Sequence, residues 1–200
     1  MKKHCPERIC IIGPPASGKS TLAKKLGQIL AYPVLYLDQI AHQPGTQWIR
    51  RPLEETIQKH DRFIRQKTWI VEGNYSRMMP QRLARADMVI FLHFNRFGCA
   101  YRCIRRSLKK DQNRAGMLAG ATDAVNWKMI KYILLKQPSK KKNYISLLKE
   151  HPHLTILHIH SFQQTDRLIS DLISLKKRCL SNNLTSQKNF FISKRKGVVA

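Results

Sequence analysis

Apolar residues gather in five short runs that are separated by longer stretches of mixed polarity. Within each run almost every position is apolar, so both alternating faces of an extended chain are hydrophobic. This pattern is typical of parallel strands that helices cover on both sides. The stretches between the runs have helical spacing, which predicts an α/β fold built on a parallel sheet. The runs are Arg8–Ile12, Pro33–Leu37, Thr68–Glu72, Met88–Phe94 and Leu154–Ile159.

Helical spacing is clearest between residues 97 and 111, where a narrow apolar stripe lies opposite a basic side. The stripe consists of Phe97, Tyr101, Ile104 and Leu108, and the basic side of Arg102, Arg106 and Lys110. Trp127, Ile130 and Leu134 also have helical spacing, and we expect all three in the core. Residues 112–122 contain two glycines and predict a loop. Further helices are predicted over Ser20–Leu30, Arg51–Gln66, Asp123–Lys136, Ser139–Glu150 and Gln163–Arg178, with a break at Pro138.

The length and the charge of the chain narrow the classes of protein. Its 200 residues suit one domain, which we place at residues 1–178 with a lid at about 97–150, followed by a basic, flexible tail at 179–200. The 37 Lys and Arg against 12 Asp and Glu give a formal charge of +25. A surface of this kind attracts polyanions such as nucleotides, nucleic acid or anionic membrane, and the charge alone does not choose among them.

Apolar runs and cysteines indicate a cytoplasmic protein. No run approaches the roughly 18 residues that a membrane span needs, and the run Ile9–Ile12 is too short for a signal peptide. The 5 cysteines are an odd number without a CxxC pair, which argues against a disulfide scaffold or a zinc site and fits a reducing compartment.

The strongest motif lies between the first predicted strand and the first predicted helix. Residues 13–20, GPPASGKS, match GxxxxGK[ST], the loop that cradles phosphates. Backbone amides and the helix N-terminus provide the donors, Lys19 is predicted to bridge β- and γ-phosphate oxygens, and Ser20 to ligate Mg²⁺. The residues expected to bind the phosphates are Gly13, Ala16, Ser17, Gly18, Lys19, Ser20 and Thr21. The alternative is a glycine-rich turn before an ordinary helix.

Two carboxylates stand where further strands end. Asp38 follows the second apolar run and Glu72 ends the third. Ligands of open parallel sheets lie beyond the carboxyl ends of the strands, so both side chains are candidates for holding Mg²⁺, and Asp38 also for accepting a proton from a hydroxyl. Asp38 as a turn or helix cap, and Glu72 as a structural residue before Gly73, are the alternatives.

Arginines in the predicted lid are candidates for stabilising a phosphoryl group in transfer. They are Arg102, Arg105, Arg106 and Arg114, of which we assign a catalytic role to Arg102 and Arg106 together with Lys19 and Asp38. A solvated basic helix face is the alternative for each of them. His158 and His160 can share a strand face near His93, but without a third ligand we expect no metal there.

Several of these segments together resemble a known family. The loop GPPASGKST at 13–21 is similar to that of adenylate kinases, and Leu37-Asp38, WIVEGNYSR at 69–77 and RADMVIFL at 85–92 resemble the adenylate-kinase-related bacterial group called "DNA topology modulation protein". The resemblance extends from about Arg8 to Arg178. It implies a P-loop kinase fold with strand order 2-3-1-4-5, ATP and Mg²⁺ as cofactors, and a lid after the fourth strand.

The chain departs from that family in several places. Glu72 stands where the family more often has Asp, and Gly116 and Ala121 stand where its lid loop has Asp and Cys. The Thr-Gly-Asp segment of true adenylate kinases is not visible near Asp38, so AMP phosphorylation is not supported.

Two functions remain from the sequence. The first is a kinase that transfers the ATP γ-phosphoryl group to an unidentified small acceptor bound between Asp38, the 74–77 turn and the 51–66 helix. The alternative is an ATP-dependent regulatory protein that contacts nucleic acid non-specifically, because residues 96–149 contain 14 Lys and Arg and two acids. A third interpretation of the charge is a basic proteome or an acidic lipid surface.

Overall fold

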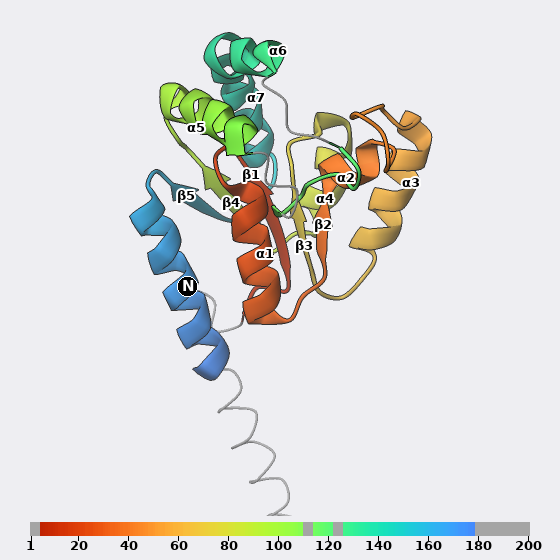
Figure 1. Cartoon of the computed structure of the whole chain (residues 1–200). Coiled ribbons are helices and arrows are strands. Elements are labelled where there is room, and N and C mark those ends of the chain that lie inside the picture. Colours follow the sequence, from red (N-terminus) through yellow and green to blue (C-terminus); the bar gives the residue numbers. More distant parts are fainter. Residues whose placement is uncertain (1–4, 110–113, 122–125, 179–200) are drawn as a thin grey trace, which may run out of the picture.

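The computed structural model describes residues 5–109, 114–121 and 126–178. Its centre is a five-stranded sheet whose neighbouring strands all run parallel, in the order β2-β3-β1-β4-β5 (Figure 1). The predicted parallel α/β fold and the strand order implied by the resemblance are confirmed. The strands are β1 (Arg8–Ile12), β2 (Val34–Tyr36), β3 (Trp69–Glu72), β4 (Met88–Leu92) and β5 (Thr155–Ile159).

Helices connect the strands, as parallel neighbours require. The bounds of the longer helices are close to those that the apolar spacing predicts, whereas the short helices over 37–41, 76–78 and 79–85 were not predicted. The helices are α1 (Lys19–Leu30), α2 (Leu37–Ala41), α3 (Leu53–Ile64), η1 (Ser76–Met78), α4 (Met79–Arg85), α5 (Arg96–Lys109), α6 (Trp127–Lys131), η2 (Tyr132–Lys136) and α7 (Gln137–Lys149), and residues 162–178 form a further helix.

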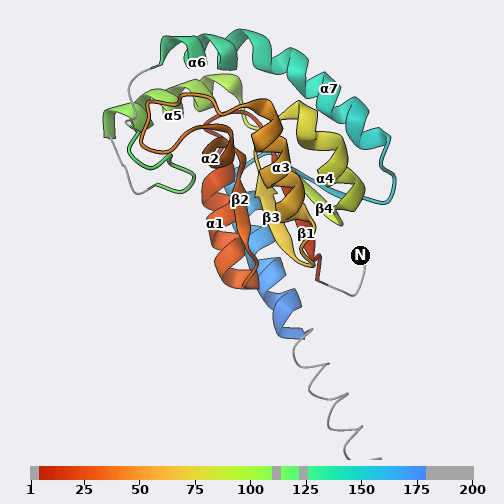
Figure 2. The ribbon, with the colours of Figure 1, turned by 90° about the vertical axis from the view of Figure 1, so that its right-hand side faces the viewer.

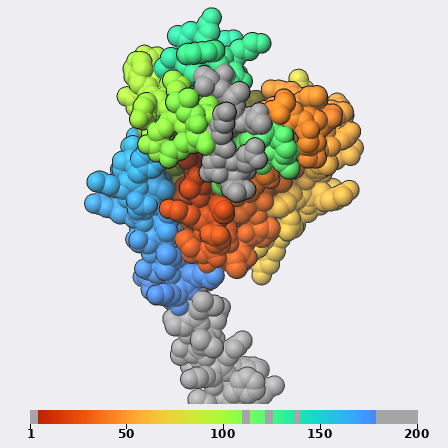
Figure 3. Space-filling view, viewed as in Figure 1, coloured from red at the N-terminus to blue at the C-terminus, as the bar shows by residue number. Residues whose placement is uncertain are grey.

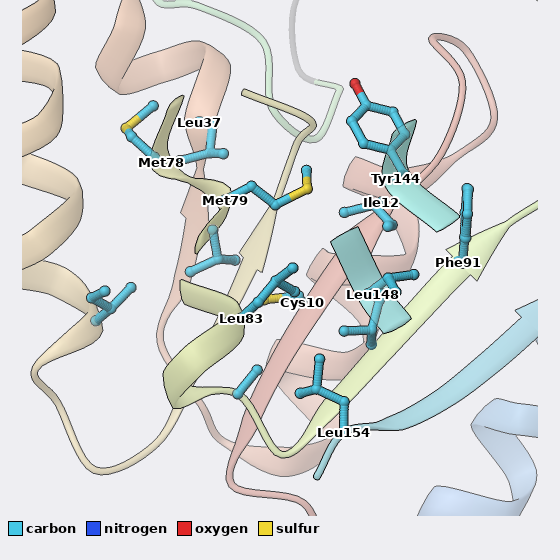
Figure 4. Packing of buried hydrophobic residues seen from close by; sticks show 14 of the residues in the cluster. Cys10, Ile12, Leu37, Met78, Met79, Leu83, Phe91, Tyr144, Leu148 and Leu154 are labelled. Carbon is cyan, nitrogen blue, oxygen red and sulfur yellow. The ribbon is translucent and has the colours of Figure 1, made fainter. Parts of the chain in front are cut away.

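The sheet is covered on both faces because successive side chains of a strand point to opposite sides. In β1, Ile9 and Ile11 pack in the cluster that includes α1 and the 162–178 helix. Cys10 and Ile12 pack on the other face, against buried side chains from α3, α4 and α7 (Figure 4). The alternation of apolar positions within one strand therefore builds a three-layer molecule.

Proline 138 does not separate two helices, so the predicted break is wrong. The chain stays helical from α6 through η2 into α7, and Figure 2 shows these segments as one long, curved helix. Pro138 lies in the first turn of α7, and η2, directly before it, is a π-helix. A proline removes one backbone donor, and the wider π-helical turns accommodate that loss without ending the helix.

Several large apolar residues of α5 and α6 lie on the outside of the molecule. On α5, Phe97 and Tyr101 are each 63% exposed and Leu108 is 70% exposed, while the side facing the molecule carries small residues such as Cys99 and Cys103. Small side chains allow α5 to approach its neighbours closely, so its larger apolar side chains point outward. Ile130 is buried as predicted and Leu134 packs beside it, but Trp127 is 73% exposed and lies outside the core.

Within the described residues, no helix combines the length and the apolar content needed to cross a bilayer. The predicted tail at 179–200 and Lys110 lie outside the described residues, as do residues 122–125 at the start of a predicted helix.

Candidate active site

The glycine-rich turn leaves β1 and leads directly into α1, as the motif predicts. Gly13 has φ of +151°, and a Cβ there would lie 2.8 Å from the carbonyl oxygen of Leu92 at the end of β4. Only glycine therefore fits where the loop passes between neighbouring strand ends. Gly18, with φ of +91°, is the residue before α1. The Ser17 hydroxyl inside the loop is buried without a hydrogen-bond partner among the described residues, which fits a loop shaped around a ligand.

Lys19 folds back over this loop. Its Nζ donates hydrogen bonds to the carbonyl oxygens of Gly13, at 3.1 Å, and Pro14, at 2.9 Å. Burial lowers the pKa of Lys19, and the carboxylates of Glu72 and Asp38 oppose that effect. The ammonium group is thus close to both acidic candidates, and the two carbonyls are weak partners that a phosphate can replace.

Ser20, Glu72 and Asp38 meet beside Lys19, although 52 residues separate the first two in the sequence. Ser20 Oγ donates to Glu72 Oε1 at 3.1 Å. Burial raises the pKa of Glu72 to about 7, an effect that the nearby Asp38 carboxylate reinforces and Lys19 opposes. The parallel register explains the convergence, because Glu72 pairs with Ile11 of β1 and with Tyr36, two residues before Asp38.

Asp38 itself is exposed at the mouth of the site. The hydroxyl of Tyr75 donates to Asp38 Oδ1 at 2.7 Å, and burial together with this carboxylate raises the pKa of Tyr75. The pair presents a carboxylate with one oxygen held in place, which can orient an acceptor hydroxyl or a metal-bound water. An oxygen donor set of one hydroxyl and two carboxylates suits Mg²⁺.

Asn74 is a site residue that the sequence interpretation missed as an individual contact. Its Oδ1 accepts from the backbone N–H of Gly13 at 3.1 Å, and its Nδ2 donates to the Gly13 carbonyl at 2.8 Å. Behind it, the fully buried Arg82 donates from Nη2 to the carbonyls of Gly73, at 2.7 Å, and Asn74, at 3.3 Å. Asn74 thus ties the β3 turn to the first residue of the phosphate loop. The sequence places Asn74 in the 74–77 turn just beyond Glu72, but nothing in it indicates the contact with Gly13.

Among the four candidate arginines, Arg102 contacts the loop and Arg106 lies near Lys19. Arg102 Nε donates to the carbonyl of Ala16 at 2.9 Å, and its guanidinium lies 5.2 Å from the Phe94 ring and 5.1 Å from the Phe162 ring. Arg106 is half-buried and close enough to lower the pKa of Lys19 slightly. Arg105 on the same helix is exposed. Arg106 is therefore the arginine whose charge faces the lysine, whereas Arg102 braces the loop.

Residues 114–121 cover the Ser20 side of the site. Gly116 has φ of +74°, and a Cβ there would lie 2.9 Å from Ser20 Oγ. Gln39 Nε2 donates to the carbonyl of Met117 at 2.8 Å, and the Gly45 N–H donates to the carbonyl of Ala119 at 2.7 Å. A side chain at position 116 would require Ser20 or Tyr36 to shift. Ala121, at the other end of this segment, is buried beside Met117 and Leu118. A pocket of about 510 Å³ lies along this segment, beside Gln39 and Pro44.

The three histidines form a cluster on the opposite side of the loop. His93 Nε2 and His158 Nδ1 are 2.7 Å apart, and the His160 ring stacks on His93 at 4.8 Å. Burial, helped by the charge of Lys141, lowers the pKa of His93 to about 4. Stacked rings do not direct their nitrogens at one ion, and no group of three or more His, Cys, Asp or Glu in the described part of the chain could hold a metal.

Comparisons with known proteins bear on the fold. No family model matches the chain, and no curated protein matches it. Among solved structures, a gluconokinase from Sinorhizobium meliloti 1021 aligns with 16% identity and a TM-score of 0.48, over 92% of this chain and 98% of that one. A candidate kinase from Chloroflexus aurantiacus aligns with 15% identity and a TM-score of 0.50, over 84% of this chain and 96% of that one.

The second alignment and the sheet order together define an α/β protein with the P-loop kinase fold. They do not extend to the narrower resemblance to the "DNA topology modulation protein" group, for which no family model matches.

Proposed function

We propose that this protein binds MgATP at the 13–20 loop and transfers the γ-phosphoryl group to a small acceptor. The observation that carries the proposal is the convergence of Lys19, Ser20, Asp38 and Glu72 at the carboxyl ends of β1, β2 and β3. An ammonium group, a hydroxyl and two carboxylates beside a glycine-rich loop are the groups that phosphoryl transfer requires.

Each residue has a distinct role in this proposal. Lys19 exchanges its two carbonyl acceptors for phosphate oxygens, while Asn74 keeps the Gly13 carbonyl hydrogen-bonded after the lysine has left it. Ser20 and the carboxylates of Glu72 and Asp38 would hold Mg²⁺, directly or through water. The ion supplies charge neutralisation between the phosphates. Glu72 has to lose its proton to take part, since its pKa is near 7.

The acceptor is expected on the Asp38 side of the loop. There Asp38 can accept the proton of an acceptor hydroxyl, which displaces Tyr75 from Oδ1. We assign α5 and the 114–121 segment to a lid, because they bring Arg106 and Gly116 over the phosphate side. Arg106 would stabilise charge on the transferring group, and Arg102 would hold the loop carbonyl of Ala16.

Calorimetry and a turnover assay test the proposal in two stages. Titration of the protein with MgATP is expected to give saturable heat that Lys19→Ala abolishes. An ADP-release assay over nucleosides, nucleotides and sugars is then expected to find at least one acceptor that raises ATP consumption above the Lys19→Ala level. Lys24→Ala, which removes an exposed lysine of α1, is the matched control. No heat with MgATP would end the proposal, and binding without turnover on any acceptor would reduce it to a nucleotide-binding protein.

A further inference from the structure

The exposed apolar side chains of the described residues are concentrated at one end of the molecule. Nine large hydrophobic side chains are exposed in that part of the chain, and six of them lie on α5, α6 and η2. We call these six the outer face: Phe97, Tyr101, Leu108, Trp127, Met129 and Leu135. The helices that carry them form the upper end of the molecule in Figure 3. Such a concentration on one region marks an interaction surface.

Among the described residues of these helices, the charged side chains around the outer face are all basic. The described residues between 96 and 149 include thirteen Lys and Arg and no Asp or Glu. Arg96, Arg105, Lys109, Lys128 and Lys131 are all exposed on the same helices. The guanidinium of Arg96 lies 5.0 Å from the Phe97 ring centroid, so a cation and an apolar ring share one piece of surface. The partner of this face therefore has to be both anionic and able to bury hydrocarbon.

We propose that the outer face docks on an anionic lipid surface. Helices with Trp, Phe and Leu beside Lys and Arg lie in the headgroup region of membranes, where the apolar side chains enter the acyl boundary and the cations contact the lipid phosphates. Tyr101 and Trp127 supply the amphipathic rings that prefer this interface. The inference is independent of the proposed kinase activity, because none of the six side chains forms a hydrogen bond or a ring contact with residues 13–20.

Aliphatic members of the face favour lipid over nucleic acid. Leu108, 70% exposed, and Leu135, 64% exposed, can neither stack on bases nor donate hydrogen bonds. They gain free energy only by leaving water for hydrocarbon. A nucleic-acid surface would use the arginines and the aromatic rings but would leave these leucines exposed.

Docking would also fix how the candidate active site faces the membrane. The side of α5 opposite the outer face holds Arg102 on the phosphate loop through Ala16. The loop would therefore lie about one helix diameter, ~10 Å, beneath the lipid surface.

Vesicle binding tests the inference with the full chain. Co-sedimentation with phosphatidylcholine vesicles and with mixed phosphatidylcholine–phosphatidylglycerol vesicles is expected to show binding to the anionic vesicles only, weakened by salt. The triple variant F97S/Y101S/L108S is expected to lose affinity ~tenfold or more, since three apolar contacts with lipid disappear. The double variant I49S/L53S, which changes exposed apolar residues away from these helices, is expected to bind like the unchanged chain. Trp127 emission should shift to the blue on binding, and W127F should remove that shift.

Two results would overturn the inference: no binding to anionic vesicles, or equal vesicle binding by the triple variant. If that variant then loses duplex DNA binding or self-association, the outer face serves that partner instead of lipid. Circular dichroism and MgATP calorimetry on the same variants separate this outcome from misfolding and from failure of the kinase proposal.

Discussion

Asn74 gives the sharpest test of how the site is assembled. Its amide makes two hydrogen bonds to the backbone of Gly13, at 3.1 and 2.8 Å. Asn74→Ala removes both hydrogen bonds and leaves the Gly13 N–H without its side-chain acceptor. A net hydrogen bond contributes ~1 kcal/mol, so two contribute ~2 kcal/mol. If that free energy is lost from the ligand-ready loop, MgATP binding weakens ~30-fold at 1.4 kcal/mol per tenfold.

Asn74→Asp separates hydrogen bonding from packing. The aspartate keeps an acceptor for the Gly13 N–H, but it sets a carboxylate oxygen against the Gly13 carbonyl where Nδ2 now donates. It also adds a negative charge beside the phosphate loop. We expect Asn74→Asp to bind MgATP more weakly than Asn74→Ala, although it is the closer match in size. Steric packing alone predicts the reverse order.

Isothermal calorimetry with MgATP and thermal melting of each variant provide the measurement. Gln66→Ala is the control, since the Gln66 amide also donates to a backbone carbonyl, that of Phe63, far from the loop. Variants of Asn74 that melt earlier yet bind MgATP as tightly as the unchanged chain would refute the reasoning, because Asn74 would then stabilise the fold without shaping the loop.

Further predictions concern the other side chains of the site. The pKa of Glu72 is raised from 4.5 to about 7, so the folded protein holds this proton more tightly than the unfolded chain does. Folding stability should therefore fall as pH rises from about 4.5 to about 7, whereas MgATP affinity should rise through about pH 7. Glu72→Gln should flatten both pH profiles, measured by chemical denaturation and by calorimetry. Gly116→Ala should weaken MgATP binding more than Gly45→Ala. Both glycines have positive φ, but only at position 116 would the new Cβ contact another side chain, that of Ser20. Equal effects would assign the loss to backbone strain alone. Once an acceptor is known, Arg106→Ala should lower kcat by ~10³ while the exposed Arg105→Ala changes it little, and equal losses would show that only overall charge matters.

Local sequence signals predicted the parts of the site that depend on neighbouring residues. The place of the 13–20 loop between β1 and α1 is predictable because strand, glycines, lysine and helix are consecutive, and the places of Asp38 and Glu72 because each directly follows or ends an apolar run. Asn74 has no comparable signal, since its partner Gly13 is 61 residues away and only the β1–β3 pairing brings them together.

Spacing alone misjudged Trp127, which follows helical periodicity with Ile130 and Leu134 but is exposed. Phe97, Tyr101 and Leu108 follow helical periodicity as core residues do, but periodicity does not tell which side of a helix meets the protein. The small residues Cys99 and Cys103 form the contact side, and their size was the overlooked indication. Pro138 predicts a helix end, whereas the π-helical segment before it allows the helix to continue.

The attachment of residues 114–121 has a kinetic consequence. Hydrogen bonds from Gln39 and from the Gly45 amide join this segment to the region around α2. Under the proposed function, these two bonds would couple the phosphate side of the site to the acceptor side, so that the two sides would open together. Entry of one reactant and departure of the other product would then share a single opening event, whose rate sets an upper limit on turnover.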